Sequence, residues 1–275
     1  MKELLKKIKL NFKFDYYLFS ANNLSLTEKI SFFFRKYISI LTNKRKILYL
    51  GSNFHYDSRL TPALLETYPK EISDLNKIVS LSKIKSVLDI GANIGQFSYT
   101  LKKGYPSLSI YSFEPNKEIF PILQKNLKNF QNLNVYNLGL GEKDEQKTFY
   151  FSPEASAEGS FYQENIHQNY HRENMKKTRV KIINLSKNLK KLSLPRKYDL
   201  VKVDVEGAEM EVLKSLKNID FNYLCIEVSI KRKGSGTLKD ITSFLAKHKK
   251  GKPKLIYYAP PEKDSPCANA IFSFK

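Results

Sequence analysis

The first residues whose types and spacing could do chemistry are two acids on either side of a glycine-spaced turn. Asp89 stands two residues before Gly91 in the segment DIGANIG, which ends at Gly95. Neither glycine carries a Cβ, so the backbone can turn tightly there and approach a ligand closely. Glu114 ends the next apolar run, where its carboxylate can accept both hydroxyls of a ribose. The pattern therefore predicts a nucleotide site.

The acid before the glycines distinguishes between two kinds of nucleotide. A dinucleotide places its pyrophosphate on a helix N-terminus, and a carboxylate beside it would repel that anion. Asp89 instead suits a ligand that carries an ammonium or sulfonium group. The spacing is also G-x-x-x-G rather than the G-x-G-x-x-G of dinucleotide sites. Both features favour S-adenosylmethionine over NAD, and an ordinary strand, turn and helix with a capping glycine is the structural alternative.

A sheet must position these residues, and the apolar runs of the chain predict one. Five runs have the length and composition of buried strands: 87–90, 108–113, 134–138, 198–205 and 223–228. Amphipathic segments with helical spacing lie between them. This alternation indicates an α/β fold with a mostly parallel, doubly wound, Rossmann-like sheet. Two later runs, 254–259 and 270–274, predict an antiparallel closing pair.

Charged residues gather at the end of the fourth predicted strand. Lys202, Asp204 and Glu206 lie along KVDVEGAE, and Glu227 ends the fifth strand. Ligands bind at the carboxyl ends of strands in such sheets, so these four are candidate catalytic residues. Asp204 is the first choice for a general base and Glu206 the second. The three acids could instead hold a divalent ion, Glu206 could cap the next helix, and Glu209 could face solvent.

Four phrases, DIGANIGQFS, FEPN, NLGLGEK and VKVDVEGAEMEVLK, resemble in order and spacing the FkbM-type family of S-adenosylmethionine-dependent methyltransferases over residues 86–228. The most specific phrase is DVEGAE. The resemblance implies that the methionine part of the cofactor is surrounded by Asp89, Gly91, Ala92, Asn93, Gly95 and Phe97. It implies that Glu114, with Pro115 beside it, binds the ribose and that the Gly141-Glu142 turn approaches adenine. The GSS-type loop of the family is matched by Gly159-Ser160, with Phe161 next.

The resemblance implies a class I methyltransferase fold and O-methylation, because family members commonly methylate hydroxyls of sugars or polyketide-like products. Methyl transfer is an in-line displacement, so the enzyme chiefly aligns the nucleophile and the methyl group. A sugar hydroxyl is a poor nucleophile and gains from a base within hydrogen-bond reach. We therefore expect an acceptor hydroxyl on a saccharide or glycoconjugate, and a divalent metal is possible but not predicted.

Composition narrows the partners and the compartment. The net charge of +20 over 275 residues predicts an anionic partner. The two cysteines, Cys225 and Cys267, provide neither a disulfide framework nor a CxxC metal motif, which fits a cytoplasmic protein. No apolar run approaches the ~18 residues of a membrane span, and we find no secretory signal.

Residues 1–70 are expected to form a basic helical extension, and residues 71–275 the methyltransferase domain. Residues 1–50 hold 11 Lys and Arg against three acids, a net charge of +8. Residues 1–14 have one apolar helical face, which either contacts a membrane peripherally or, as we prefer, packs on the main domain. A second amphipathic segment covers residues 26–41.

A second basic segment, residues 171–202, holds 11 Lys and Arg against two acids, a net charge of +9. A solvated face is the default interpretation, although some of these side chains could reach a phosphorylated or acidic substrate. Residues 153–178 are expected to form a surface loop near the substrate. His167 and His171 have the i, i+4 spacing of a metal pair, but no third ligand is evident nearby, so we expect no metal there.

Two other functions compete with this interpretation. The charge suggests an RNA methyltransferase, but an amino-directed enzyme of that kind would carry an Asn/Asp-Pro-Pro-aromatic turn where this chain has Asp-Val-Glu-Gly. A non-catalytic protein could keep the fold and hold a membrane or glycan with its basic surface. Asp89, Glu114 and Asp204 are all present, and a protein that only binds would not need that set.

Overall fold

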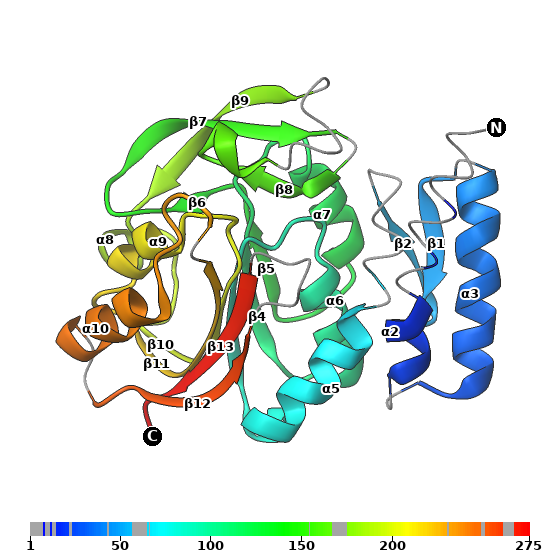
Figure 1. Cartoon of the computed structure of the whole chain (residues 1–275), viewed down its shortest axis with the longest axis horizontal. Coiled ribbons are helices and arrows are strands. Elements are labelled where there is room, and N and C mark those ends of the chain that lie inside the picture. The colour runs from blue at the N-terminus through cyan, green and yellow to red at the C-terminus, as the bar shows by residue number, and fades with distance from the viewer. Residues whose placement is uncertain are drawn as a thin grey trace.

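The computed structural model describes Ile8, Phe12, Leu65 and residues 15–21, 24–42, 44–56, 67–153, 155–166, 175–229, 231–248, 251–260 and 267–275. The described residues form a seven-stranded sheet, a four-stranded sheet and a two-stranded hairpin near the N-terminus, with helices around them (Figure 1). The smaller sheet lies above one end of the larger sheet, and the N-terminal helices lie to one side.

The larger sheet has seven strands in the order β12-β13-β11-β10-β3-β4-β5. Five of them are mutually parallel: β3 (Ser86–Ile90), β4 (Ser109–Phe113), β5 (Leu133–Tyr136), β10 (Lys197–Val203) and β11 (Asp220–Ser229). At the other edge, β13 (Cys267–Ser273) pairs antiparallel with both β11 and β12 (Lys254–Ala259). From β3 the chain first adds strands on one side (β4, β5) and then crosses to the other side (β10, β11), so the strand order reverses between β3 and β10. Open α/β sheets bind ligands at such a point. The predicted fold class, with its antiparallel closing strands, is confirmed.

Helices cover both faces of this sheet. On one face, α5 (Thr67–Val79), the short helix η1 (Leu81–Lys83) and α6 (Gln96–Gly104) pack on Val87 and Leu200. On the other, α8 (Leu185–Asn188), α9 (Glu209–Ser215) and α10 (Leu238–His248) pack on Leu88 and Val201. The remaining helix, α7 (Phe120–Leu127), packs beside α6. Because successive strand residues point to opposite faces, a doubly covered sheet requires continuous apolar strands, as the sequence has.

The smaller sheet has the order β6-β9-β7-β8, formed by β6 (Gly139–Leu140), β7 (Glu145–Ser152), β8 (Ala155–Ser160) and β9 (Lys176–Ile183). A short helix, η2 (Gln163–Asn165), follows β8. The prediction of a loop over residues 153–178 was therefore wrong for 155–160 and 176–178. The sequence ASAEGS has no apolar alternation, and it becomes a strand by pairing with β7. The two histidines of the predicted loop lie outside the described residues.

Within the second basic segment, residues 176–183 form β9 and residues 185–188 form α8 before the chain reaches β10. Along β9, exposed Lys177, Arg179 and Lys181 alternate with buried Thr178 and Val180. The exposed basic side chains thus form a solvated face.

The N-terminal region contains α2 (Asp15–Ser20), α3 (Leu26–Leu41) and a hairpin of β1 (Lys46–Tyr49) and β2 (Ser52–His55), so it is not only helical. Tyr49 and Phe54 pack on Tyr99 of α6, and the Tyr49 hydroxyl lies 2.8 Å from that of Thr100. The region therefore shares a core with the main sheet's helices. Among the described residues, no helix is long and apolar enough to cross a membrane.

Candidate active site

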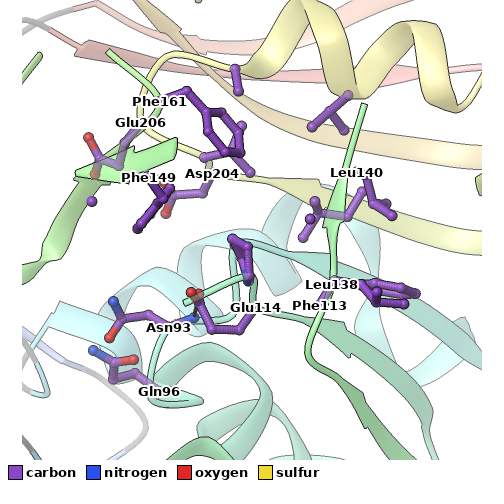
Figure 2. Close-up of a pocket in the computed structure, with 18 of the residues that line it drawn as sticks. Asn93, Gln96, Phe113, Glu114, Leu138, Leu140, Phe149, Phe161, Asp204 and Glu206 are labelled. Atoms are coloured by element: carbon purple, nitrogen blue, oxygen red, sulfur yellow. Dashed lines mark hydrogen bonds between the residues drawn. The ribbon is translucent and has the colours of Figure 1, made fainter. Parts of the chain in front are cut away.

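A cavity of about 210 Å³ lies at the carboxyl ends of β3, β4 and β10, beneath the smaller sheet. Figure 2 shows its labelled residues, with Asp204 and Glu206 on the opposite side from Asn93 and Gln96. Six of the residues predicted to bind the cofactor or do chemistry line this cavity. Five of them are Gly91 and Asn93 of the turn, Glu114 and Pro115 after β4, and Asp204 after β10. Glu206 also lines it.

The glycine turn brings β3 and β10 together at the cavity floor. Gly91 has a positive φ of 84°, and its N–H donates to the Phe113 carbonyl at 3.0 Å. A Cβ on Gly91 would collide with the backbone carbonyl of Asp204. Because Gly91 has no side chain, the glycine turn and Asp204 can both line the same cavity.

Glu114 fixes the turn from the neighbouring strand. Its Oε2 accepts the Asn93 N–H at 2.9 Å, and its Oε1 accepts the Asn116 N–H at 2.8 Å. A carboxylate oxygen has two lone pairs and can accept more than one hydrogen bond, so this side chain is suited to the hydroxyls of a ligand. A carboxylate that accepts hydrogen bonds at this position fits the hydroxyls of a ribose.

Apolar side chains line another part of the cavity. Phe113, Leu138 and Leu140 make one wall, while Phe149 of β7 and Phe161, which follows β8, lie across the cavity beside Asp204 and Glu206 (Figure 2). Such a slot fits a flat, weakly polar ring such as a purine.

The Gly141-Glu142 turn, expected near adenine, does not line this wall. The Gly141 N–H donates to the Ile183 carbonyl at 3.0 Å, and the Glu142 carboxylate pairs with Lys214 at 2.9 Å outside the cavity. Residues 138–140, directly before that turn, take the place at the wall.

Asp89 does not face the cavity either, although it was expected to meet a cationic ligand. It is fully buried, and its Oδ2 accepts the Ser98 hydroxyl at 2.6 Å. Lys202 is the residue of β10 that lies next to Asp89 in register. Burial raises the pKa of Asp89, and the positive charge of Lys202 partly offsets this rise. In the described part of the molecule, its Oδ1 has no hydrogen-bond partner. Asp89 therefore lies in the protein interior next to the glycine turn, where it contacts Ser98 of α6 and not the cavity.

Three further residues expected at the cofactor also lie behind the cavity wall. Ala92 and Phe97 are buried in the core, and the Lys202 ammonium lies 5.3 Å from the centre of the Phe97 ring. Gly95, with φ 92°, begins α6, and a Cβ there would press against Leu123 and Leu127 of α7. These residues shape the turn through packing.

Lys202 and Asp204 form an ion pair at the cavity edge. The Lys202 Nζ lies 2.9 Å from the Asp204 Oδ2. Burial would lower the pKa of Lys202, but Asp204 and Asp89 raise it well above its ordinary value. Burial would raise the pKa of Asp204, but Lys202 lowers it, and Arg232 adds to this. At neutral pH Lys202 is therefore protonated and cannot act as a base, whereas Asp204 is ionised and can.

Glu206 belongs to a second charged group with Glu227 and Arg232. One nitrogen of the Arg232 guanidinium lies 2.5 Å from a carboxylate oxygen of each acid. Burial and the neighbouring Glu227 raise the pKa of Glu206 well above its ordinary value. Glu206 therefore takes up a proton more readily than Asp204. Glu227, the remaining predicted catalytic acid, does not line the cavity.

The predicted metal ligands do come together, since oxygens of Asp204, Glu206 and Glu227 lie within 4.8 Å of one another. Arg232, however, already supplies positive charge to two of them. A divalent ion could take this place only if the guanidinium moved away, because two cations would repel each other there.

The smaller sheet holds the Glu206 loop in place. Glu206 has a positive φ of 55°, and its carbonyl accepts the Ser160 hydroxyl at 2.7 Å and the Asn165 amide at 3.1 Å. Glu209, for which exposure to solvent was one alternative, is fully buried, and its Oε1 accepts the Gly207 N–H at 3.1 Å. The side chains of Ser160, Asn165 and Glu209 therefore stabilise the loop that carries Asp204 and Glu206.

Sequence reasoning missed Arg232, Gln96, Phe149 and the apolar wall. The Lys-Arg-Lys run directly after β11 was a signal for Arg232. Phe149 belongs to β7, and nothing in the sequence places that strand over the cavity.

The chain matches the family model described as Methyltransferase FkbM domain over residues 89–252, more than half of its length. It is 31% identical over 143 residues to Methyltransferase 1 of Beauveria bassiana (strain ARSEF 2860), covering 47% of this chain and 57% of that protein. It is 29% identical over 163 residues to Methyltransferase sdnD of Sordaria araneosa, covering 50% of this chain and 63% of that protein. The chain thus spans less than two thirds of the length of either relative.

Among solved structures, the chain is similar to precorrin-6y C5,15-methyltransferase from Geobacter metallireducens GS-15, with a TM-score of 0.40 and 14% identity. The alignment covers 75% of this chain and 88% of that one. The family match spans the β3 turn, the β4 end and the β10 acids that build the cavity. This chain belongs to the FkbM family of methyltransferases, whose cofactor is S-adenosylmethionine.

Proposed function

We propose that this protein transfers a methyl group from S-adenosylmethionine to a hydroxyl group of a saccharide or glycoconjugate. The observation that carries the proposal is the Asp204 carboxylate on the cavity wall, 2.9 Å from the Lys202 ammonium that lowers its pKa. A hydroxyl acceptor needs such a base, because its oxygen is a weak nucleophile until its proton is removed.

The cavity residues fit the cofactor in three parts. Glu114 would accept the ribose hydroxyls, the apolar wall of Phe113, Leu138 and Leu140 would hold the adenine, and the Gly91 turn would lie against the methionine part. When bound, S-adenosylmethionine supplies an electrophilic methyl group on a sulfonium centre. The protein's own residues must then orient the acceptor oxygen and take its proton.

Replacing Glu114 with glutamine is expected to weaken binding of S-adenosylhomocysteine by about 10- to 100-fold, as expected from the loss of hydrogen bonds to a charged group. The glutamine NH2 would also face a backbone N–H in place of a carboxylate oxygen. The matched control is Glu142→Gln, because Glu142 lies outside the cavity and pairs with Lys214. Calorimetric titration of both variants checks this, and equal weakening in both would remove Glu114 from the ribose site.

A second cavity, of about 400 Å³, would hold a distal part of the acceptor, while the reacting hydroxyl would lie in the first cavity beside Asp204. The first turn of α5 separates the two, since Tyr68 lines the first cavity while Thr67 and Glu71 line the second. The second cavity combines the aromatic rings of Tyr17 and Tyr257 with polar groups that include Asp74 and Asn269. This mixture of aromatic surface and hydrogen-bonding groups supports a saccharide, whose ring has apolar faces and hydroxyl edges.

The test is transfer of tritiated methyl from S-adenosylmethionine to isolated glycoconjugate fractions and, in parallel, to RNA. We expect label in saccharide that survives mild alkali, as a methyl ether does. Label in RNA, or alkali-labile label on protein carboxyl groups, would contradict the proposal. S-adenosylhomocysteine binding with no transfer to any fraction would favour a protein that only binds.

Lys202 is expected to set the pH dependence of the reaction. Lys202→Met removes the charge that lowers the pKa of Asp204, so burial should raise that pKa. A base works only when deprotonated, and its rate contribution is lost as pH falls through its pKa. The acid limb of the kcat profile should therefore move to higher pH in Lys202→Met and stay near its wild-type position in Lys202→Arg. An unmoved limb in Lys202→Met would argue against Asp204 as the base.

A further inference from the structure

The helix α3 presents an apolar face to solvent. Along this face the side chains of Leu26, Ile30, Phe34, Ile38 and Leu41 are 65%, 42%, 61%, 55% and 58% exposed. Their spacing of three and four residues places them on a single side of the helix. Figure 1 shows α3 at the outer edge of the molecule, with the other labelled helices and strands on its other side. We call these five residues the α3 outer face.

The opposite side of α3 already makes the contacts that hold the helix to the protein. Phe32 is buried against Tyr49, with ring centres 5.6 Å apart. Lys36 is buried and forms an ion pair with Asp15 of α2, which also accepts the Tyr37 hydroxyl at 2.8 Å. The outer face is therefore not needed to pack the helix.

Aromatic contacts extend the outer face onto α2. Phe19 is 43% exposed, and its ring centre lies 6.1 Å from that of Phe33. Phe33 in turn contacts Phe34 at 5.6 Å. Lys29 ties the two helices together by donating to the Phe19 carbonyl at 2.9 Å. The exposed apolar residues of α3 and Phe19 therefore form a group linked by ring contacts, unlike the singly scattered exposed apolar residues of an ordinary surface.

Positive charge borders this surface. Arg35, Lys44, Arg45 and Lys46 are exposed, and the one acid of α3, Glu28, is held in a capping box with Ser25. An apolar face beside basic side chains is complementary to a bilayer that contains anionic lipids. A second copy of the chain is a poorer occupant, because a symmetric contact would bring the same basic residues together.

We propose that the α3 outer face, with Phe19, docks on an anionic lipid bilayer and holds the protein at the membrane surface. The helix would lie along the interface with its apolar side chains among the acyl chains and its basic residues at the headgroups. This assigns membrane contact to α3 rather than to residues 1–14 alone, and it does not depend on the proposed acceptor.

The test is flotation of the full chain with vesicles of phosphatidylcholine, with and without phosphatidylglycerol. Wild type is expected to float with the anionic vesicles only, and less so at high salt. The double variant Phe34→Ser/Ile38→Ser should bind at least about tenfold more weakly, because burying each side chain contributes a factor of that order. The matched control is Leu255→Ser/Tyr258→Ser on β12, whose side chains are 41% and 40% exposed.

S-adenosylhomocysteine affinity and the melting temperature should be the same in all these proteins, which shows that they fold. A second variant, Arg35→Glu/Lys44→Glu, should also lose binding to the anionic vesicles. Wild-type flotation of the Phe34/Ile38 double variant would overturn the proposal, particularly if deletion of residues 1–14 abolished flotation. Failure of wild type to float, with a dimer that the double variant converts to a monomer, would assign the face to a second copy instead.

Discussion

Asparagine in place of Asp204 is expected to lower kcat by about 10²- to 10⁴-fold, the range for loss of a general base. The amide has nearly the same shape as the carboxylate but cannot take up the acceptor proton. Affinity for S-adenosylhomocysteine should remain within a few-fold, because Glu114 and the apolar wall are unchanged. The measurement is kcat with the acceptor found by methyl transfer, together with calorimetric titration of S-adenosylhomocysteine.

The matched control for Asp204 is Glu211→Gln. Glu211 is also a carboxylate paired with a lysine, Lys147, at 2.6 Å, but it does not line the cavity. We expect its kcat to stay near the wild-type value. Because Asp204→Asn leaves the buried Lys202 without its anion, its melting temperature must be measured, and Asp204→Glu serves as the charge-conserving variant. A folded Asp204→Asn enzyme with near wild-type kcat would move the base to Glu206, which Glu206→Gln would then test.

Alanine in place of Gly91 is expected to abolish cofactor binding and to lower the free energy of unfolding by about 3 kcal/mol or more, as for other strained or overpacked sites. The new Cβ would meet the Asp204 backbone carbonyl, and the φ of 84° is unfavourable for alanine. Separating Gly91 from Asp204 would also disturb the hydrogen bond from the Asp204 N–H to the Ile90 carbonyl, 3.1 Å long. Urea unfolding followed by circular dichroism measures the stability.

Gly104→Ala is the control for the Gly91 prediction. Gly104 is the last residue of α6, and a Cβ there would meet nothing within 4 Å. Alanine has a higher helix propensity than glycine, so stability should be unchanged or higher by up to about 1 kcal/mol. If Gly91→Ala unfolded at the same urea concentration as Gly104→Ala and bound S-adenosylhomocysteine normally, the close approach of β3 and β10 would not be required.

The sequence was sufficient to predict the sheet and the position of the site along it. Buried parallel strands such as β10 are continuous apolar runs, and the helices between them have clear amphipathic spacing. Ligands in such sheets bind at the carboxyl strand ends, so Glu114 and Asp204 could be placed at the cavity without coordinates. These predictions depend only on local patterns and on the general topology.

The direction of individual side chains could not be predicted in the same way. Asp89 and Ile90 are adjacent on β3 and must point to opposite faces, but both faces of this sheet are covered by helices. Only the packed structure shows that Asp89 points toward Ser98 and Lys202. The pairing of Arg232 with Glu206 and Glu227 likewise depends on a loop that follows β11 and folds back over β10.

The smaller sheet and α3 show a second limit of the sequence. β8 carries no strand signal of its own and is formed by its pairing with β7, so its place over the cavity depends on long-range contacts. The amphipathic pattern of residues 26–41 predicted the helix but not which apolar residues would stay exposed. Phe32 and Phe34 are two positions apart, and the first is buried while the second faces solvent.

The assignment of the cavity to S-adenosylmethionine is tested most directly by calorimetric titration of the full chain with S-adenosylhomocysteine and, separately, with NADH. The turn, Glu114 and the apolar wall predict saturable binding of S-adenosylhomocysteine at a single site and no binding of NADH. Binding of NADH, or no binding of S-adenosylhomocysteine by protein shown to be folded, would contradict the assignment.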